Sequence, residues 1–451
     1  MTFKNKKVLV IGTGISGIAA TELLNKMNGK VILFDGNTNL DKEEIYHKIG
    51  GKDKADIILG DLEEDIIREL DLAIISPGVP TDIPMVKELK KRNIPVWGEV
   101  ELAYQCSKGR IIGITGTNGK TTTTALTGEI MKTWQKDVFV VGNIGTPYTR
   151  MVSSMKDSSV TVAEMSSFQL ETIKDFRPDV AAILNITPDH LNRHHTMENY
   201  IDAKANIFKN QKSHDTLVLN YEDDILRELV KKAKAHIIYF SSKRALDHGV
   251  YLENENIICS LNGEKNIVCN IHEVKLLGIH NYENIMAAIG IAASINVPME
   301  SIKKAIAAFD GVEHRIEYVD EKNGVKYYND SKGTNPDAAI QGIKAMVTPT
   351  LLIGGGFDKN SDYEEWIQSF DGKVRYLVLL GQTREKIAET ARKLGFHNII
   401  MVDTLEEAVD VCSRRAKPGD SVLLSPACAS WGMFKNYEER GRMFKELVYR
   451  L

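Results

Sequence analysis

Short apolar runs alternate with longer amphipathic segments along most of this chain. In the first hundred residues the runs lie at 6–11, 30–35, 56–60 and 72–78, and each is rich in Val, Ile or Leu. Residues 15–27 carry apolar side chains at helical spacing. Short β-branched runs that end at turn residues are typical of buried strands, and their alternation with helices predicts right-handed βαβ units. Residues 1–98 are therefore predicted to form a Rossmann-like domain with a parallel sheet.

A second block, residues 99–311, begins with the same pattern and then departs from it. Apolar runs at 110–115, 138–142, 160–165, 180–185 and 216–220 predict a mostly parallel sheet with helices between the strands. Residues 248–278 instead alternate with the turn sequences ENEN and NGEK, which predicts antiparallel hairpins. Two helical patterns, at 281–295 and 299–309, close this central block.

The third block, residues 312–451, returns to alternating strands and helices. Its predicted strands lie at 325–330, 350–355, 376–381, 398–402 and 421–426, and a final helix follows the turn SPACASWG. This pattern predicts a second Rossmann-like, doubly wound sheet. A chain of 451 residues is too long for one core, so we expect an α/β protein of three domains.

Composition limits the classes of function. Charged residues make up 26% of the chain, hydrophobic residues 43%, and the net charge is −4, so we expect no nucleic-acid partner and no basic membrane patch. Five scattered cysteines with no C-x-x-C pair argue against a zinc ribbon or a disulfide scaffold and favour a reducing cytoplasm. No apolar run has the length of a membrane span or the form of a secretory signal.

The sequence GITGTNGKTTTT, residues 113–124, joins a predicted strand to a predicted helix through a glycine-rich turn. Such a turn directs backbone N–H groups and the positive end of the helix into one concavity. Lys120 adds a positive charge, and Thr121 offers a hydroxyl to a magnesium ion. The strict P-loop spacing is not met, because Ile114 stands where the first glycine belongs. The flanking strand and helix still favour a nucleotide phosphate site over an ordinary glycine-rich turn.

A second glycine pattern opens the chain. Gly12, Gly14 and Gly17 form G-x-G-x-x-G directly after the first predicted strand, and Asp35 ends the next one. In dinucleotide-binding folds an acid at this place binds ribose, which suggests NAD. The same turn accepts any nucleotide diphosphate, so a UDP-linked ligand fits equally well, and a tight turn without a ligand is the plain alternative. The strand, turn, helix and acid together favour a bound nucleotide.

Three further segments indicate a family. They are AEMSSFQLE (163–171), ILNITPDHLNRH (183–194) and SPACASWGMFKNYEERG (425–441). Together with TGTNGKTTTT, GNIGTP and NDSKGTNP they resemble the Mur ligases, in the same order and over essentially the whole chain. The GTNGKT motif is shared with folylpolyglutamate synthases, whereas SSFQLE and SPACAS are more specific to the branch that adds D-glutamate. The third block lacks the D-N-P-R sequence of the diamino-acid-adding branch.

The resemblance implies an ATP-dependent amide ligase of peptidoglycan precursor synthesis. Such an enzyme joins D-glutamate to UDP-N-acetylmuramoyl-L-alanine through an acyl phosphate and releases ADP and phosphate. It implies two Mg²⁺ ions, a cytoplasmic location and a monomer. A folylpolyglutamate synthase needs no UDP site, and an NAD-dependent oxidoreductase leaves GTNGKT unexplained. A nucleotide-binding regulator descended from a ligase is disfavoured by the presence of Lys120, Glu164 and His190.

The resemblance also implies roles for single residues at the ATP site. Lys120, Glu164, His190, Lys204 and Arg315 are expected to be catalytic, and Thr121, Glu164, His190 and Lys204 to hold metal. The remaining ATP-binding positions are Gly116, Thr117, Asn118, Gly119, Thr122, Asn281 and Asp330, together with Lys120, Thr121 and Arg315.

Substrate positions follow by the same route. The residues implied for the UDP-linked substrate are Gly14, Ile15, Ser16, Asp35, Gly36, Asn37, Ser76, Pro77, Gly78, Asn143, Ser166 and Gln169. Those implied for D-glutamate are Lys332, Thr334, Lys359, Ser430 and Tyr437. Asp358 and the Tyr437 hydroxyl receive no role.

The sequence alone gives plainer interpretations of some of these positions. Glu164 would be an exposed acid at a strand end, and Lys204 a solvated helix lysine. The resemblance instead implies that CO₂ carbamylates Lys204, which makes it an anion able to hold Mg²⁺. The histidines of TPDHLNRHH raise the possibility of zinc, because His190 and His194 share a face of a helix. We expect His194 and His195 to lie in a solvated loop.

Overall fold

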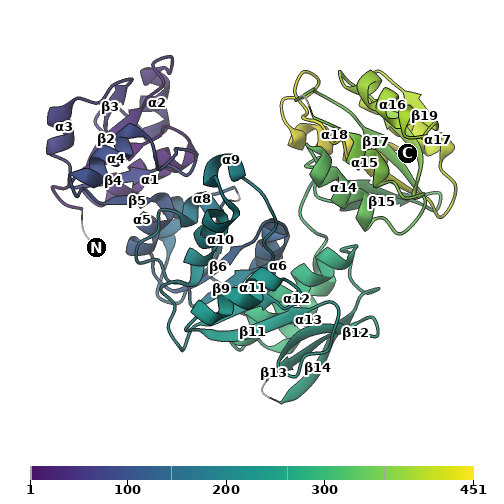
Figure 1. Ribbon diagram of the computed structural model, residues 1–451, viewed down its shortest axis with the longest axis horizontal. Helices are drawn as coiled ribbons and strands as arrows, with labels where there is room; N and C mark the ends of the chain where they lie inside the picture. The colour runs from purple at the N-terminus through teal and green to yellow at the C-terminus, as the bar shows by residue number, and fades with distance from the viewer. Residues whose placement is uncertain (1–2, 144, 262, 360) are drawn as a thin grey trace. The chain divides into compact units, whose positions relative to one another are not determined.

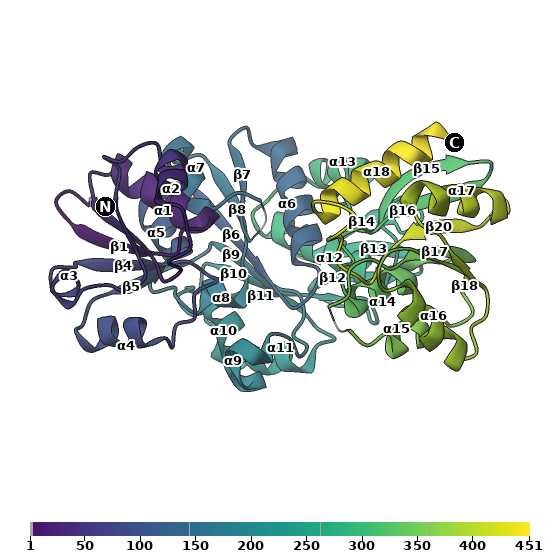
Figure 2. The same cartoon turned by 90° about the horizontal axis from the view of Figure 1, so that it is seen from above.

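The computed structural model describes residues 3–143, 145–261, 263–359 and 361–451, which form three sheets flanked by helices (Figure 1 and Figure 2). The chain divides into two compact units. Unit 1 comprises Met1–Cys269 and Glu283–Ile306, and unit 2 comprises Asn270–Tyr282 and Ala307–Leu451. Each unit is described by itself below.

The N-terminal sheet of unit 1 is parallel throughout, with the order β3-β2-β1-β4-β5. Its strands are β1 (Lys7–Ile11), β2 (Lys30–Asp35), β3 (Asp56–Leu59), β4 (Leu72–Ile75) and β5 (Val96–Gly98), and its helices are α1 (Ile15–Lys26), α2 (Lys42–Ile49), α3 (Glu64–Arg68) and α4 (Pro84–Lys91). The strand order reverses between β1 and β4. In open α/β sheets ligands bind beside the carboxyl ends of the strands at such a reversal.

The second sheet of unit 1 has nine described strands in the order β14-β13-β12-β11-β10-β9-β6-β8-β7. They are β6 (Arg110–Thr115), β7 (Val138–Gly142), β8 (Val160–Glu164), β9 (Val180–Ile183), β10 (Thr216–Asn220), β11 (His236–Ser241), β12 (Gly249–Glu253), β13 (Asn256–Leu261) and β14 (Glu264–Asn270). Strands β6 to β12 pair in parallel, and β13 runs antiparallel to β12, as the turn sequences predict.

The helices that follow the N-terminal sheet in the sequence, up to residue 311, lie beside the nine-stranded sheet, except for the first of them, which packs against β4, β5 and α1. They are α5 (Glu99–Cys106), α6 (Lys120–Trp134), α7 (Tyr148–Met151), α8 (Ser167–Leu170), α9 (Leu191–His194), α10 (Met197–Ala205), α11 (Asp224–Leu229), α12 (Ile279–Ser294) and α13 (Met299–Ala308). Strand β6 lies between β9 and β8, so the turn that follows it emerges at the middle of the parallel part of the sheet.

The sheet of unit 2 has the order β15-β16-β20-β17-β18-β19. Its strands are β15 (Glu317–Lys322), β16 (Val325–Asn329), β17 (Thr350–Gly354), β18 (Val374–Leu379), β19 (Ile399–Met401) and β20 (Ser421–Leu424), with helices α14 (Pro336–Ala345), α15 (Glu364–Gln368), α16 (Arg384–Lys393), α17 (Leu405–Arg415) and α18 (Tyr437–Arg450). The predicted doubly wound sheet is present. The antiparallel edge strand β15, rich in charged residues, was not foreseen from the sequence.

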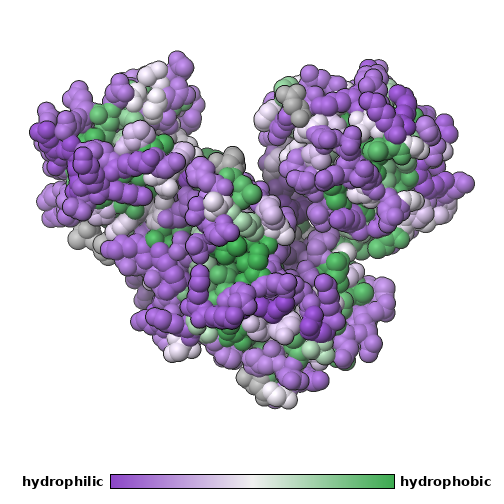
Figure 3. Space-filling view, viewed as in Figure 1, coloured by the Kyte–Doolittle hydropathy of each residue, from purple (hydrophilic) through white to green (hydrophobic). Residues whose placement is uncertain are grey.

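Polar residues cover most of the face shown in Figure 3, with smaller apolar areas between them. Among the described residues, none of the helices combines the length and the apolar character that crossing a bilayer requires.

The glycines of the turn after β1 differ in how much space a side chain would have. A Cβ atom at Gly17 would collide with the carbonyl oxygen of Gly12, whereas a Cβ at Gly14 would have nothing within 4 Å. We expect Gly17→Ala to lower the free energy of unfolding by about 1–3 kcal/mol, because α1 must move away from the turn. Gly14→Ala should change it by less than about 0.5 kcal/mol. Urea denaturation of both variants tests this, and equal losses would contradict it.

Candidate functional site

The turn after β6 holds its backbone in conformations that require glycine. Gly116 has φ 155° and Gly119 has φ 82°, and a Cβ at Gly119 would collide with the side chain of Asn284. The N–H of Thr117 donates to the carbonyl of Asn185 over 2.9 Å, and the N–H of Asn118 donates to the side chain of Asn185 over 2.8 Å. The turn is thereby fixed at the N-terminus of α6, where helix dipole and free N–H groups favour a phosphate.

Two lysines donate to one carbonyl oxygen in this turn. The Nζ of Lys120 lies 2.9 Å and the Nζ of Lys204 2.7 Å from the oxygen of Gly116. Lys204 is 2% exposed, so the expectation of a solvated lysine is wrong. Burial, and next the charge of Lys120, lower the pKa of Lys204 to about 6. The Lys204 amine is therefore largely neutral at pH 7.

Glu164 at the end of β8 is also buried, at 1% exposure, which corrects its interpretation as an exposed acid. Its Oε1 accepts a hydrogen bond of 2.8 Å from the side-chain amide of Asn143. Its Oε2 is buried and has no hydrogen-bond partner among the described residues. Since a buried carboxylate oxygen is normally paired, this atom fits a ligand for a cation.

These residues suit a magnesium ion that is shared with a nucleotide. Thr121 lies in the first turn of α6 and is 7% exposed. No group of three His, Cys, Asp or Glu side chains converges into a metal site in the described ranges, so the zinc interpretation gains no support. Mg²⁺ typically takes one or two protein ligands and fills the rest of its shell with phosphate oxygens and water. Glu164 and Thr121 can supply the protein ligands.

His190 precedes α9 in a strained backbone conformation, with φ 52°. Its ring packs on Phe168, with ring centroids 4.9 Å apart, and its Nε2 lies 3.4 Å from a carboxylate oxygen of Asp189. Non-glycine residues at positive φ are uncommon and concentrate at functional sites. Asp189 also influences Lys204 electrostatically, so this acid belongs to the surroundings of the site although the sequence analysis passed over it.

The expectation of a solvated His194 is wrong, because this ring is 4% exposed. Its Nε2 lies 2.9 Å from the hydroxyl of Ser167, and its Nδ1 lies 3.1 Å from a carboxylate oxygen of Glu171. Burial lowers the pKa of His194. The ring therefore connects the SSFQLE and HLNRHH segments as an internal structural residue, whereas His195 is exposed as expected.

In the N-terminal sheet, Asp35 holds the glycine turn together. Its Oδ2 accepts hydrogen bonds from the N–H and the hydroxyl of Thr13, at 3.1 and 2.8 Å, and its Oδ1 accepts one from the N–H of Asn37. Ser76, directly after β4, has a buried hydroxyl without a partner among the described residues. The predicted UDP-substrate positions 14–16, 35–37 and 76–78 thus lie at or just after the carboxyl ends of β1, β2 and β4, at one edge of the sheet.

A cleft of about 640 Å³ opens beside Asp35 and Gly36. It combines this polar corner with a largely apolar wall made of Ile11, Phe34, Leu62, Ile67, Val79, Ile83, Pro84 and Met85. An apolar slot with a few polar groups at one end suits a nucleobase and its sugar. Of the other predicted positions, Ser166 and Gln169 form a capping box that begins α8, and Asn143 is bonded to Glu164.

Unit 2 carries the remaining predicted ATP positions. Arg315 lies between His314 and Ile316, whose φ values are 66° and 47°. A β-branched residue at positive φ is a genuine outlier, so this turn stores strain. The Arg315 guanidinium is half-buried and has no hydrogen bond or ion pair within the described part of unit 2. Asn281 also belongs to unit 2, where its side chain donates to the carbonyl of Leu277.

Asp330 faces the interior of unit 2. It is 4% exposed, and its Oδ2 accepts a hydrogen bond of 2.6 Å from the hydroxyl of Ser425. Burial raises the pKa of Asp330 to about 7. The hydrogen bond with Ser425 joins the loop after β16 to the loop after β20. The predicted ATP ligand Asp330 therefore lies between these two loops.

The predicted D-glutamate positions lie on neighbouring loops of the unit 2 sheet. Lys332 and Thr334 follow β16, Ser430 follows β20, and Tyr437 begins α18. The Nζ of Lys332 lies 5.9 Å from the centre of the Tyr437 ring, so these two residues are brought together. The Nζ of Lys359 lies 4.8 Å from the ring of Trp431, the neighbour of Ser430.

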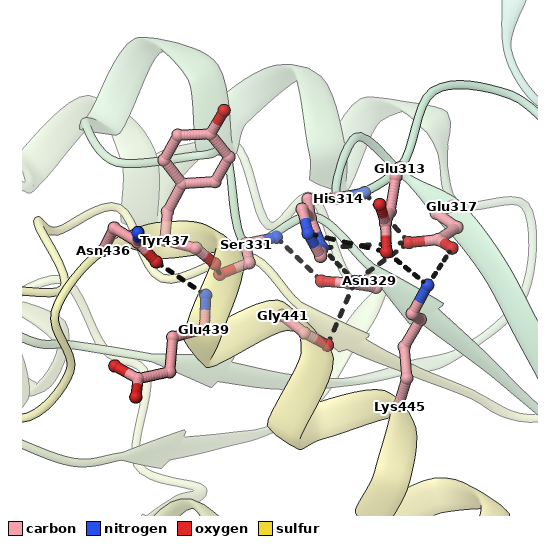
Figure 4. A network of polar contacts seen from close by, with 10 residues as sticks. All are labelled: Glu313, His314, Glu317, Asn329, Ser331, Asn436, Tyr437, Glu439, Gly441 and Lys445. Carbon is pink, nitrogen blue, oxygen red and sulfur yellow. Dashed lines mark hydrogen bonds and ion pairs between the residues drawn. The ribbon is translucent and has the colours of Figure 1, made fainter. Parts of the chain in front are cut away.

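A polar network anchors the start of α18 to this region (Figure 4). His314 contacts the Tyr437 ring edge-on, with centroids 6.0 Å apart, and its Nδ1 lies 2.9 Å from the side-chain amide nitrogen of Asn329. The hydroxyl of Ser331 donates to the carbonyl of Tyr437 over 2.8 Å. Further along α18, Lys445 forms ion pairs of 2.8 Å with Glu313 and Glu317.

Two residues near the predicted sites, Tyr200 and Arg440, were not predicted from the sequence, although their positions in the helical pattern could have indicated them. Tyr200 precedes Lys204 by one helical turn in α10, its ring lies 4.7 Å from the lysine Nζ, and its hydroxyl lies 3.0 Å from that of Thr117. Arg440 shares the buried face of α18 with Phe444 and Val448, at a spacing of four residues. An arginine in the apolar register of a helix is unusual and could have been noticed.

Three α/β sheets, a glycine-rich phosphate turn and a separate nucleotide-type cleft define a multidomain nucleotide-binding protein. Family models match the chain as "Mur ligase MurD-like, N-terminal domain" over residues 6–98, "Mur ligase middle domain" over 114–292 and "Mur ligase, glutamate ligase domain" over 314–428. The chain belongs to the Mur ligase family.

Curated relatives match along the full length. The chain is 62% identical over 451 residues to the UDP-N-acetylmuramoylalanine–D-glutamate ligase of Lachnoclostridium phytofermentans, covering 100% of this chain and 99% of the relative. It is 54% identical to the enzyme of the same name from Lachnospira eligens, covering 100% of both. The fold also matches the MurF ligase of Thermotoga maritima crystallised with ADP, with a TM-score of 0.59, 19% identity, and 99% and 96% of the two chains covered.

The buried amine of Lys204 makes stability depend on pH. Burial lowers the pKa of Lys204 from 10.5 to about 6. Between these two pH values Lys204 is protonated in the unfolded chain and neutral in the folded protein. Stability contributed by this group therefore rises as pH rises from about 6 towards 10.5. In CO₂-free buffer, Lys204→Met should be more stable than the wild type near pH 6, and this difference should shrink at higher pH.

Denaturant unfolding across that range measures the difference directly. Lys132→Met, which changes a half-exposed lysine on α6, serves as the control and should give no such trend. A stability difference for Lys204→Met that does not vary with pH would contradict the assignment.

Proposed function

We propose that this chain is the ATP-dependent ligase that adds D-glutamate to UDP-N-acetylmuramoyl-L-alanine during synthesis of the peptidoglycan precursor. The main support for this proposal is the 62% identity, along the full length, to an enzyme named for that reaction. The two lysines at the phosphate turn and the cleft beside Asp35 supply sites that suit the two nucleotide substrates.

The chemistry requires a carboxylate to be activated before an amine can attack it. The alanyl carboxylate attacks the γ-phosphorus of ATP, ADP leaves, and an acyl phosphate forms. The neutral amine of D-glutamate then attacks the acyl carbon, phosphate leaves, and the amine loses a proton. The backbone of residues 116–119 and Lys120 bind the phosphate groups and keep the attacking oxygen in line. Arg315 contributes positive charge to the transferred group.

Magnesium, when bound, would neutralise charge on the phosphate oxygens. In this proposal Thr121 and Glu164 hold the ion that the nucleotide shares, and His190 orders the surroundings of a second ion. The unpaired Oε2 of Glu164 supports the first assignment.

Lys204 has the properties that carbamylation requires. The reaction joins the lysine nitrogen to the carbon of CO₂ and releases one proton, so it needs a neutral amine. Burial beside Lys120 makes the amine neutral at ordinary pH. The product is an anion next to a lysine cation, which replaces a repulsion by an attraction. Its oxygens are ligands that Mg²⁺ accepts.

The three blocks divide the substrates among them. We assign the UDP-linked substrate to residues 1–98, assisted by Asn143, Ser166 and Gln169, and ATP to residues 99–311, assisted by Arg315 and Asp330. Residues 312–451 bind D-glutamate through Lys332, Thr334, Lys359, Ser430 and Tyr437. The substrates place the enzyme in the cytoplasm, and none of these assignments needs a second subunit.

Phosphate release from ATP in the presence of Mg²⁺ and UDP-N-acetylmuramoyl-L-alanine, across a panel of amino acids, tests the proposal. We expect release with D-glutamate and a product whose mass equals the two joined substrates minus water. Release with another amino acid alone would overturn the substrate assignment. No release with any amino acid, despite measurable ATP binding, would favour a nucleotide-binding regulator.

Lys204→Ala tests the carbamate. We expect a loss of activity of at least about 100-fold, because replacing even a residue that only supports a metal ligand can lower activity by up to about that factor. Short-chain carboxylic acids should restore part of it, because their carboxylate can occupy the position of the carbamate. Lys209→Ala is the control, since Lys209 is an exposed lysine five residues further along the chain that also donates to a backbone carbonyl, that of Ile173. Full activity of Lys204→Ala would refute the role.

A further inference from the structure

Helix α18 buries a guanidinium group that forms no ion pair among the described residues, although the charge of Asp330 acts on it from a longer distance. Arg440 is 2% exposed. Its Nε donates to the hydroxyl of Ser331 over 2.9 Å, its Nη2 to the carbonyl of Ser331 over 2.8 Å, and its Nη1 to the carbonyl of Cys428 over 3.2 Å. All three acceptors are uncharged. The group therefore holds backbone positions and is not one half of a salt bridge.

The acceptors belong to two different loops. Ser331 lies in the loop that follows β16, and Cys428 lies in the loop that follows β20, the strand next to β16 in the sheet. The first loop carries Lys332 and Thr334, and the second carries Ser430, the positions assigned above to D-glutamate. One side chain thus fixes the spacing between the two halves of the proposed amino-acid site.

The same arginine is tied to a third part of that site. Tyr437 lies one turn before Arg440 on α18, and its carbonyl accepts the hydroxyl hydrogen bond of Ser331. Loop, helix start and arginine are therefore joined through Ser331, which is fully buried. On the other loop, Ala427 has φ 57°, a strained conformation for a residue with a Cβ atom, immediately before the carbonyl that Arg440 holds.

Packing alone does not call for an arginine here. Phe444 and Val448 already bury the same face of α18, and Lys445 anchors the helix through its ion pairs. Burying a cation costs desolvation energy, which the charge of Asp330 offsets only in part, and an apolar residue of similar size avoids that cost. Burial lowers the pKa of Arg440 to about 10. What the guanidinium adds is a planar fork that grips several acceptors in a fixed geometry.

We propose that Arg440 is a positioning residue that sets the distance between the 330–334 and 427–431 loops and so determines the affinity for D-glutamate. The inference rests on the proposed function. A dicarboxylic amino acid needs a cation and hydroxyl donors at a fixed spacing, and these groups come from both loops. Arg440 touches neither substrate nor reacting atoms and acts through Ser331 and Cys428.

Steady-state kinetics of Arg440→Lys and Arg440→Met test the proposal. We expect the KM for D-glutamate to rise at least tenfold in both variants, since a misplaced loop can weaken binding by this factor or more. The KM for UDP-N-acetylmuramoyl-L-alanine, whose assigned positions lie outside these two loops, should stay within about twofold. Lysine at position 440 should not restore the affinity for D-glutamate, because one ammonium group cannot donate to three acceptors that lie in a plane.

Lys445→Met is the matched control. It removes a cation from the same helix and breaks the ion pairs with Glu313 and Glu317 shown in Figure 4. It should lower the melting temperature and leave the KM for D-glutamate unchanged. If the Arg440 variants do not fold, Ser331→Ala removes the hydroxyl that accepts from Arg440 and donates to the Tyr437 carbonyl, and it should raise the same KM by at least about threefold, since each lost hydrogen bond can contribute about that factor.

The outcomes separate the two proposals. A wild-type protein that turns over D-glutamate, with an unchanged KM in the Arg440 variants, overturns this inference alone. This inference is also overturned if Lys445→Met and the Arg440 variants raise the KM values for all three substrates to the same extent, because the cause is then a general loss of stability. A wild-type protein that ligates a different amino acid overturns the proposed function and, with it, the role of Arg440 towards D-glutamate.

Discussion

The carbonyl oxygen of Gly116 is the point on which the nucleotide end of this protein depends. Two lysine amino groups, from the turn itself and from α10, lie within hydrogen-bond distance of it. Such crowding is tolerated only because burial and repulsion make one amine neutral. The backbone that permits it exists because Gly116 and Gly119 adopt conformations that residues with a Cβ atom rarely reach. Loop conformation and lysine chemistry are therefore consequences of one constraint.

The amino-acid end of the proposed reaction is organised differently. Its loops follow neighbouring strands of the unit 2 sheet and are held by buried polar groups as well as by apolar packing. Asp330 braces one loop against Ser425, and Arg440 joins the same loop to the carbonyl of Cys428. Strained residues accompany this arrangement, at His314 and Ile316 beside Arg315 and at Ala427. Strain of this kind persists only where the surrounding structure over-determines the backbone.

The parts of the fold that could be read from the chain are those governed by local patterns. The apolar runs located β1, β2, β4, β6, β8 and β10 because buried parallel strands need little else, and the hairpin of β12 and β13 followed from its turn residues. The edge strand β15 was not predicted because four of the six residues in its sequence EYVDEK are charged and none is buried. Such a strand is decided by pairing with β16 and not by its own composition.

At the site, the sequence by itself determined which chemical groups are available and which turns must carry them. The glycine patterns, the lysine after Gly119 and the acid at the end of β8 follow from motifs whose backbone geometry is local. Burial was decided by the tertiary structure. Glu164, His194 and Lys204 all read as solvated from sequence, and all lie in the interior, because burial depends on segments distant in the chain that cover them. Since burial sets the pKa of a lysine and the pairing of a carboxylate, only the folded protein decided what these side chains can do.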